Sequence, residues 1–242
     1  MKVRLLTSCT AAKAVRAPDW ITWADFKKGK EHLARRMAAL RSWRMPAGRL
    51  YAGRQHMLLM RAVTALRHQG GLTPEVWILS AGFGLVSENT PLIPYEISFS
   101  EMGEEERRVW AKELEVPDQV AAWLMQPSDL NVVLLGHAYL DAAGIHPKTQ
   151  IKAPTLFFCS RRSSLLVPEV AHVKTVVLTQ AEARRFRTPL ISLKGLLAAR
   201  LLIYLKDTRD VEHLMRPETD VLALLEKVRE PESEQLHLFE LA

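Results

Sequence analysis

Residues 78–86 read Ile78-Leu-Ser-Ala-Gly-Phe-Gly-Leu-Val86, an apolar run that leads into a turn with two glycines. A continuous apolar run of this kind is typical of a strand that is buried on both faces. Polar strings lie on either side of it in the sequence, Leu50-Tyr-Ala-Gly-Arg-Gln-His56 before it and Ile93-Pro-Tyr-Glu96 after it. A phenol, a guanidinium, an imidazole and a carboxylate beside a glycine-rich turn favour a pocket for a small molecule or a nucleobase.

Four further apolar runs predict buried strands, and each ends in small, polar or basic residues. They cover residues 3–7, 132–135, 156–158 and 176–178. Helical patterns lie between the runs, at residues 54–68, 104–115 and 118–125. Strands that alternate with helices predict an α/β fold, a three-layer sandwich with a mainly parallel central sheet. In such sheets ligands bind at the carboxyl ends of the strands, where this sequence keeps its polar residues.

Length and composition suggest one sizeable core with an appendage. We expect an α/β domain over residues 1–205, a short helical extension over 206–230 and a flexible tail over 231–242. The two cysteines have no zinc-binding spacing, and no apolar run approaches the roughly 18 residues of a membrane span. We therefore expect a cytoplasmic protein without a metal, a cofactor or a membrane partner.

The charge is distributed unevenly along the chain. The segment from Asp207 to the end has four Lys or Arg and ten Asp or Glu, whereas the preceding residues have 29 and 17, a net charge of +12. A basic body with an acidic tail favours a DNA partner, although many basic domains bind no nucleic acid. The basic residues Arg35, Arg36, Arg54, Arg161 and Arg162 are the predicted phosphate contacts, with solvated arginines as the alternative.

A short apolar motif stands almost at the end of the chain. Gln235-Leu-His-Leu-Phe239 follows a polar, acidic stretch. The motif resembles the sliding-clamp-binding pattern of bacterial replication and repair proteins, with Gln235, Leu236, Leu238 and Phe239 at the matching positions. This resemblance implies that the tail docks on the clamp; the alternative is that its apolar side chains fold back onto the body.

Several strings resemble a diffuse group of bacterial proteins that includes the YaaA-type peroxide-stress proteins. The matching strings are Ser8-Cys9, Leu50-Tyr-Ala-Gly53, Ile78-Leu-Ser-Ala-Gly-Phe-Gly-Leu85 and Pro94-Tyr-Glu96. The glycosylase-like domain of archaeosine synthases has a similar layout, and the wider group resembles the uracil-DNA-glycosylase fold. The resemblance implies a DNA glycosylase of repair or antiviral defence that flips out and excises a modified base, such as a modified cytosine. Position 96 is Glu where the pattern has Asp.

Cleavage of an N-glycosidic bond needs a carboxylate near the sugar and a hydrogen-bond donor near the leaving base. Glu96 is the first candidate for the carboxylate, with Glu88 and Asp141 as the other candidates. His137 is the candidate donor to the base. Each of these side chains could instead have only a structural role.

The other predicted site residues would contact the extruded base. They are Ser8, Cys9, Tyr51, Gly53, Ser80, Gly82, Phe83, Gly84, Tyr95 and Tyr139. Gly82 and Gly84 would let the N–H groups of the turn face a phosphate or a base edge. A nucleophilic role for Cys9 has less support, because no histidine is visibly paired with it. A non-catalytic DNA-binding stress protein and a base-exchange transferase remain alternative functions.

Overall fold

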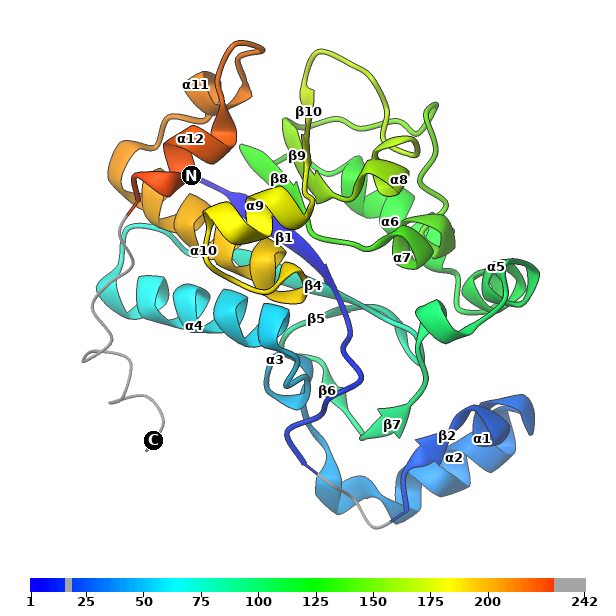
Figure 1. Cartoon of the computed structure of the whole chain (residues 1–242). Coiled ribbons are helices and arrows are strands. Elements are labelled where there is room, and N and C mark those ends of the chain that lie inside the picture. Colours follow the sequence, from blue (N-terminus) through cyan, green and yellow to red (C-terminus); the bar gives the residue numbers. More distant parts are fainter. Residues whose placement is uncertain (16–18, 229–242) are drawn as a thin grey trace.

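The computed structural model describes residues 1–15 and 19–228 and centres on a six-stranded sheet (Figure 1). The order across the sheet is β10-β9-β8-β1-β4-β5, in which the first five are parallel and β5 is antiparallel to β4. The strands are β1 (Val3–Ser8), β4 (Glu75–Ser80), β5 (Gly84–Ser87), β8 (Leu130–Val133), β9 (Thr155–Cys159) and β10 (Val173–Val177). In chain order the parallel strands have the doubly wound arrangement 2-1-3-4-5.

Helices cover both faces of the sheet (Figure 1). On one face lie α4 (Arg54–Gln69), α9 (Gln180–Arg185) and α10 (Leu190–Thr208); on the other lie α5 (Glu104–Glu113), α6 (Val116–Leu124), α7 (His137–Ala142) and α8 (Arg161–Ser164). The α4 and α10 backbones touch at Gly195, where an added Cβ would lie 2.2 Å from the carbonyl oxygen of Gln55. The α/β class and the mainly parallel central sheet predicted from the sequence are confirmed.

The edge strand β5 departs from the all-parallel pattern of its neighbours. The glycine-rich string 78–86 forms a tight hairpin, in which Ile78 pairs with Val86 and Ser80 with Gly84 around a three-residue loop. Hairpins with short loops need backbone freedom at one position, and Gly84 supplies it with a φ of 71°. The sequence predicted the strand and the turn but not the returning strand.

A small lobe lies at one end of the sheet (Figure 1). It contains β2 (Ile21–Thr22), α1 (Trp23–Lys27), α2 (Lys30–Ala39) and a 3-10 turn (Arg41–Trp43), and β2 pairs in parallel with β7 (Tyr95–Glu96). The strands β3 (Met45–Pro46) and β6 (Pro91–Leu92) form a second short pair, followed by α3 (Ala47–Leu50) and later by a 3-10 turn (Phe99–Glu101). The helix α2 ends at Ala39, and the 3-10 turn follows it after Leu40.

The C-terminal helices pack back onto the body. α10 continues through the predicted boundary at residue 205, and α11 (Val211–Met215) and α12 (Val221–Glu226) follow it. Leu214 and Leu225 are fully buried, so this extension adds to the core. The clamp-like pentapeptide at 235–239 lies outside the described residues, and its role stays a prediction. No helix in the described ranges combines the length and the apolar character needed to cross a bilayer.

Candidate active site

The carboxyl edge of the sheet brings together most of the predicted site residues. The chain runs from β1 to β4 on one side and later to β8 on the other side of β1, which makes the β1–β8 boundary a topological switch point. The Cys9 thiol follows β1 and lies 3.0 Å from the hydroxyl of Tyr139, which stands on the helix after β8. The Ser98 hydroxyl lies 3.2 Å from the same Tyr139 oxygen. Three hydrogen-bonding side chains from distant segments thus meet where such folds bind ligands.

A chain of hydroxyl groups lies beside this first group. The Tyr51 and Tyr95 hydroxyls are 2.8 Å apart, and the Tyr95 hydroxyl is 2.7 Å from Ser80 Oγ. Ser80 Oγ also accepts the N–H groups of Gly82 and Phe83, at 3.3 and 3.1 Å. With both lone pairs used in this way, the Ser80 hydroxyl donates to Tyr95. Either phenol can be the donor in the contact between Tyr95 and Tyr51.

The two groups form one cluster, because the Ala81 N–H donates to Cys9 Sγ at 3.4 Å. Tyr51, Tyr95 and Tyr139 are all at most 5% exposed. Burial raises the pKa of each of these phenols above its ordinary value. These phenols therefore stay protonated at physiological pH and act as hydrogen-bonding groups. Tyr95 is fully buried, so its ring has no open face on which a base could stack.

The glycines of the turn allow close packing. The expectation that the N–H groups of this turn face a phosphate or a base edge is therefore wrong. The N–H groups of Gly82 and Phe83 bond to Ser80 Oγ and so do not face a ligand. A Cβ on Gly82 would lie 2.8 Å from Phe26 Cζ and 3.2 Å from the Tyr95 ring. A Cβ on Gly84 would lie 2.9 Å from Gln119 Oε1. Gly82 is required because aromatic side chains pack directly on its backbone, and Gly84 because its φ of 71° favours glycine.

Gly53 has a similar role one loop away. Its N–H donates to Thr10 Oγ1 at 3.1 Å, and an added Cβ would lie 2.6 Å from the Thr10 side chain. This contact holds the loop after β1 against the start of α4. His56 in the same helix is buried, with its Nε2 2.9 Å from the Gly48 carbonyl oxygen. The Gly53 contact therefore fixes the loop that carries Cys9, and the His56 contact fixes α4 against α3.

The three candidate carboxylates have different surroundings. Glu88 is buried and paired with the Arg67 guanidinium, with 2.8 Å between Arg67 Nη1 and Glu88 Oε2. Asp141 is held by Arg107, 2.8 Å from its Nε, and by Arg108. Glu96 is exposed and forms no salt bridge within residues 1–15 and 19–228. Glu96 is thus the carboxylate that remains available to a substrate.

His137 begins α7 directly after Gly136. Its side chain is half-buried, and burial lowers its pKa, with the nearby Arg162 adding to the effect. The ring is therefore neutral at pH 7, and its buried Nδ1 has no hydrogen-bond partner among the described residues. A neutral imidazole that is partly exposed can donate a hydrogen bond to the edge of a base.

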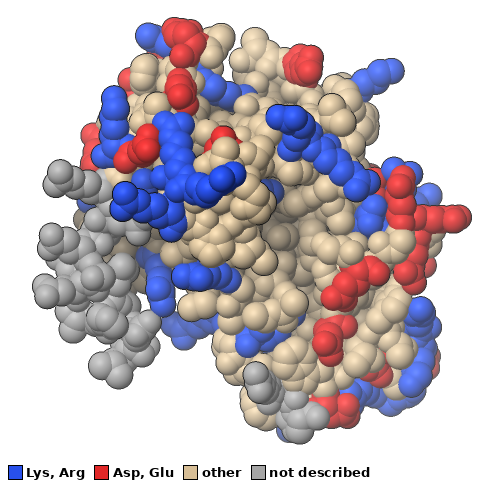
Figure 2. Space-filling view, viewed as in Figure 1, with Lys and Arg blue, Asp and Glu red and all other residues tan. Residues whose placement is uncertain are grey.

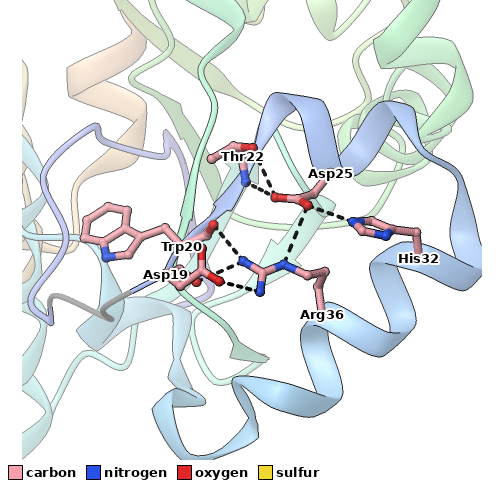
Figure 3. A network of polar contacts seen from close by, with 6 residues as sticks. All are labelled: Asp19, Trp20, Thr22, Asp25, His32 and Arg36. Atoms are coloured by element: carbon pink, nitrogen blue, oxygen red, sulfur yellow. Dashed lines mark hydrogen bonds and ion pairs between the residues drawn. The ribbon is translucent and has the colours of Figure 1, made fainter.

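The small lobe supports the segment that carries Tyr95 and Glu96. Ile21 pairs with Tyr95 and Thr22 with Glu96 across the β2–β7 ladder. Figure 3 shows the polar network behind β2, which is centred on Asp25. The Asp25 carboxylate accepts the N–H of Thr22 at 2.9 Å and lies 2.8 Å from His32 Nε2. These contacts, the backbone bond first, hold the pKa of Asp25 well below its usual range.

Arg36 belongs to the same network, which corrects its prediction as a phosphate contact. Its Nη1 lies 2.8 Å from Asp19 Oδ2, and its Nε lies 3.6 Å from Asp25 Oδ1 (Figure 3). A guanidinium engaged by these two carboxylates ties α2 to α1 and to the segment before β2. The other predicted phosphate contacts, Arg35, Arg54, Arg161 and Arg162, are exposed.

The charged side chains frame one hollowed face of the molecule. Figure 2 shows this face hollowed near its centre, with Lys and Arg gathered above and to the left and Asp and Glu along the right. Arg161 and Arg162 lie on α8 next to the carboxyl end of β9, and Ser8 ends β1. The basic residues on this rim can bind phosphates near the strand ends.

Two partly buried lysines lie near the carboxyl edge of the sheet, and the sequence did not reveal them as candidates. Lys13 lies in the loop after β1, with Nζ 4.7 Å from the centre of the Tyr95 ring. Lys194 on α10 donates to the carbonyl oxygen of Leu135 at 2.6 Å, and burial lowers its pKa to about 8. Lys194 stands in the longest apolar helix, and an isolated cation in an apolar pattern is a signal that could have revealed it. Lys13 has no such signal, since it stands in a loop, where a lysine is an ordinary residue.

A cavity of about 720 Å³ has Tyr51 in its wall. Its wall includes Arg49, Arg61, His56 and the paired Arg67 and Glu88. The described residues contain no cluster of three or more His, Cys, Asp or Glu that could hold a metal ion. Tyr51 therefore belongs both to the strand-end cluster and to the wall of this cavity.

The fold and the site define a doubly wound α/β protein with a polar cluster at the switch point of its sheet. Residues 38–156 match the model of DUF6884, a family of unknown function. The matched segment includes Tyr51, Tyr95, Glu96 and Tyr139 but begins after Cys9 and Lys13. Neither the curated proteins nor the solved structures contain a significant match to this chain.

Proposed function

We propose that this protein is a DNA glycosylase that excises a modified base by hydrolysis of its N-glycosidic bond. The observation that carries the proposal is the placement of Glu96, an exposed carboxylate without a salt-bridge partner among the described residues, on the strand pair that also carries Tyr95. The other two carboxylates are occupied by arginines. The proposal includes the uracil-DNA-glycosylase type of fold, and the sheet order with a site after β1 and β8 supports it.

In the proposed reaction the base leaves the stack and enters the cluster between the ends of β1 and β8. As the bond breaks, the sugar becomes cation-like, and the Glu96 carboxylate stabilises it and orients the attacking water. The neutral His137 ring donates to the departing base, which gains negative charge. Removing a base from the stack costs a few kcal/mol, least for a damaged or modified base.

DNA is the proposed partner because the basic rim lies next to the cluster. Arg161 and Arg162 follow β9, and the charge of Arg162 reaches His137. Guanidinium groups beside the strand ends can hold the phosphates on either side of an extruded nucleotide.

The test is the formation of abasic sites. We would incubate the protein with unmodified DNA and with DNA that contains hydroxymethylated or glucosylated cytosine, and then cleave at abasic sites. Strand breaks on one type of DNA are expected, with at least a 100-fold slower rate in Glu96→Gln. The matched control is Glu105→Gln, which changes an exposed carboxylate on α5 and should leave the rate unchanged. Binding without breaks on every DNA would contradict the proposal and favour a non-catalytic DNA-binding protein.

A further inference from the structure

Lys13 occupies an enclosed position beside the hydroxyl cluster. Its Nζ lies 4.7 Å from the centre of the Tyr95 ring and 5.5 Å from that of Tyr51. The same Nζ donates to the Thr10 carbonyl oxygen at 2.7 Å, and the Lys13 backbone forms a β-bridge with Tyr51. Two aromatic rings and a backbone bridge thus fix an amine at the end of β1, next to Cys9.

The titratable groups that face this amine come from three segments. Cys9 lies in the same loop, Glu96 on β7 and Glu101 at the end of the 3-10 turn after it. Burial lowers the pKa of Lys13, and the nearby acidic groups oppose that effect. Partial desolvation makes a larger fraction of a lysine neutral, and the neutral amine is the nucleophilic form.

We propose that Lys13 forms an imine with C1′ of the deoxyribose that base excision leaves behind, so that the protein also cleaves DNA at abasic sites. The inference rests on the proposed glycosylase function, which supplies the abasic site. The geometry behind it is an amine held by Tyr51 and Tyr95, with a carboxylate on the neighbouring strand.

The proposed step balances without a cofactor. The Nζ lone pair attacks the C1′ aldehyde of the ring-opened sugar, and the carbinolamine loses water to give a protonated imine. A carboxylate, Glu96, takes a proton from C2′; the C2′–H electrons form a C2′–C3′ double bond as the C3′–O bond breaks. The 3′ phosphate leaves with that electron pair. Water then hydrolyses the imine, which restores the Lys13 amine and releases an unsaturated aldehyde.

Burial also lowers the pKa of Lys194, to about 8, but the position of this lysine does not suit the step. Its Nζ donates to the Leu134 and Leu135 carbonyl oxygens at the end of β8 and lies on the α10 side of the sheet. Its ammonium group therefore donates hydrogen bonds to carbonyl groups at a strand end, whereas Lys13 borders the cluster that contains the predicted site residues.

The test uses a duplex in which uracil-DNA glycosylase has already converted one uracil into an abasic site. The full chain is mixed with this duplex and sodium borohydride, which reduces an imine to a stable amine. A covalent protein–DNA adduct is expected on a denaturing gel, and mass spectrometry should locate it at Lys13. Lys13→Met and Lys13→Arg should each lower the adduct yield at least tenfold, while Lys28→Met, a change of an exposed lysine in the small lobe, should not.

A thermal unfolding curve for each variant shows whether it is folded, and the Arg variant keeps the positive charge. An adduct of undiminished yield in both Lys13 variants, an adduct on another amine, or no adduct at all would overturn the proposal. Because the abasic site is made beforehand, trapping does not depend on base excision by this protein. Excision without trapping would therefore refute the imine alone, and trapping without excision would refute the glycosylase alone.

Discussion

The Cys9 thiol and the Tyr139 hydroxyl lie 3.0 Å apart across the switch point of the sheet, although 130 residues separate them in the chain. Cys9 follows the first strand, and Tyr139 stands on the helix that follows the third parallel strand. The contact joins the two halves of the doubly wound sheet at the edge where ligands bind in such folds.

The two cysteines should differ in reactivity. Burial raises the pKa of the Cys159 thiol to about 11, so that at pH 8 about one molecule in a thousand carries its thiolate. Cys9 is 6% exposed at the strand-end cluster, against 1% for Cys159. Iodoacetamide at pH 8 should therefore label Cys9 first, as measured by peptide mass spectrometry. In 6 M urea both should react, and equal labelling in the native protein would contradict the prediction.

Substitution of Gly82 should destabilise the site. The Cβ in Gly82→Ala would lie 2.8 Å from Phe26 Cζ and would displace the Phe26 and Tyr95 rings. Overpacking of this kind costs about 1–3 kcal/mol of unfolding free energy, which urea titration measures. Gly103→Ala is the matched control, because no atom lies within 4 Å of its added Cβ, and the loss should be smaller there. Equal losses in the two variants would show that the Phe26 contact is unimportant.

The Asp25 network should give the stability a dependence on pH. The folded protein holds the pKa of Asp25 below its unfolded value, chiefly through the Thr22 N–H. The carboxylate's contribution is therefore fully present above about pH 4 and is lost as the pH falls further. At pH 7 Asp25→Asn should lower the free energy of unfolding by about 1–3 kcal/mol, and the difference from the unsubstituted protein should shrink below about pH 4.

Asp19→Asn provides the control for that measurement. Asp19 pairs with the same Arg36, but its side chain is 74% exposed, so its removal should cost less than about 1 kcal/mol. A larger loss for Asp19 than for Asp25, or a difference that grows toward acid pH, would refute the account of the network.

The α8 arginines should contribute to DNA binding through phosphates. Fluorescence anisotropy with duplex DNA gives the association constant at several salt concentrations. In the double variant Arg161→Ala/Arg162→Ala, the slope of the logarithm of this constant against the logarithm of the salt concentration should decrease by about 2 in magnitude. Lys2→Ala is the control, since Lys2 precedes β1 at the opposite edge of the sheet. An unchanged slope in the double variant would place the DNA elsewhere, and Arg35→Ala would then test the small lobe.

The predicted site residues illustrate which parts of a site a sequence can reveal. Cys9, Ser80 and Tyr139 all follow or end buried apolar runs, and the carboxyl ends of neighbouring parallel strands share one edge. Their proximity was therefore predictable from the order of strands and helices. The Tyr51–Tyr95 contact was not predictable, because it depends on the β2–β7 ladder of a lobe with no clear pattern.

The sequence by itself determined the buried parallel strands and the helices between them, because burial leaves a local pattern of apolar residues that can be counted along the chain. Only the tertiary structure decided that Arg36 binds Asp19 and Asp25, that Asp141 is engaged by Arg107, and that Lys13 faces Tyr95. A charged side chain shows its type in the sequence but not its partner. The partner depends on segments that folding brings together from far along the chain, and so does the choice between a structural ion pair and a free group at the site.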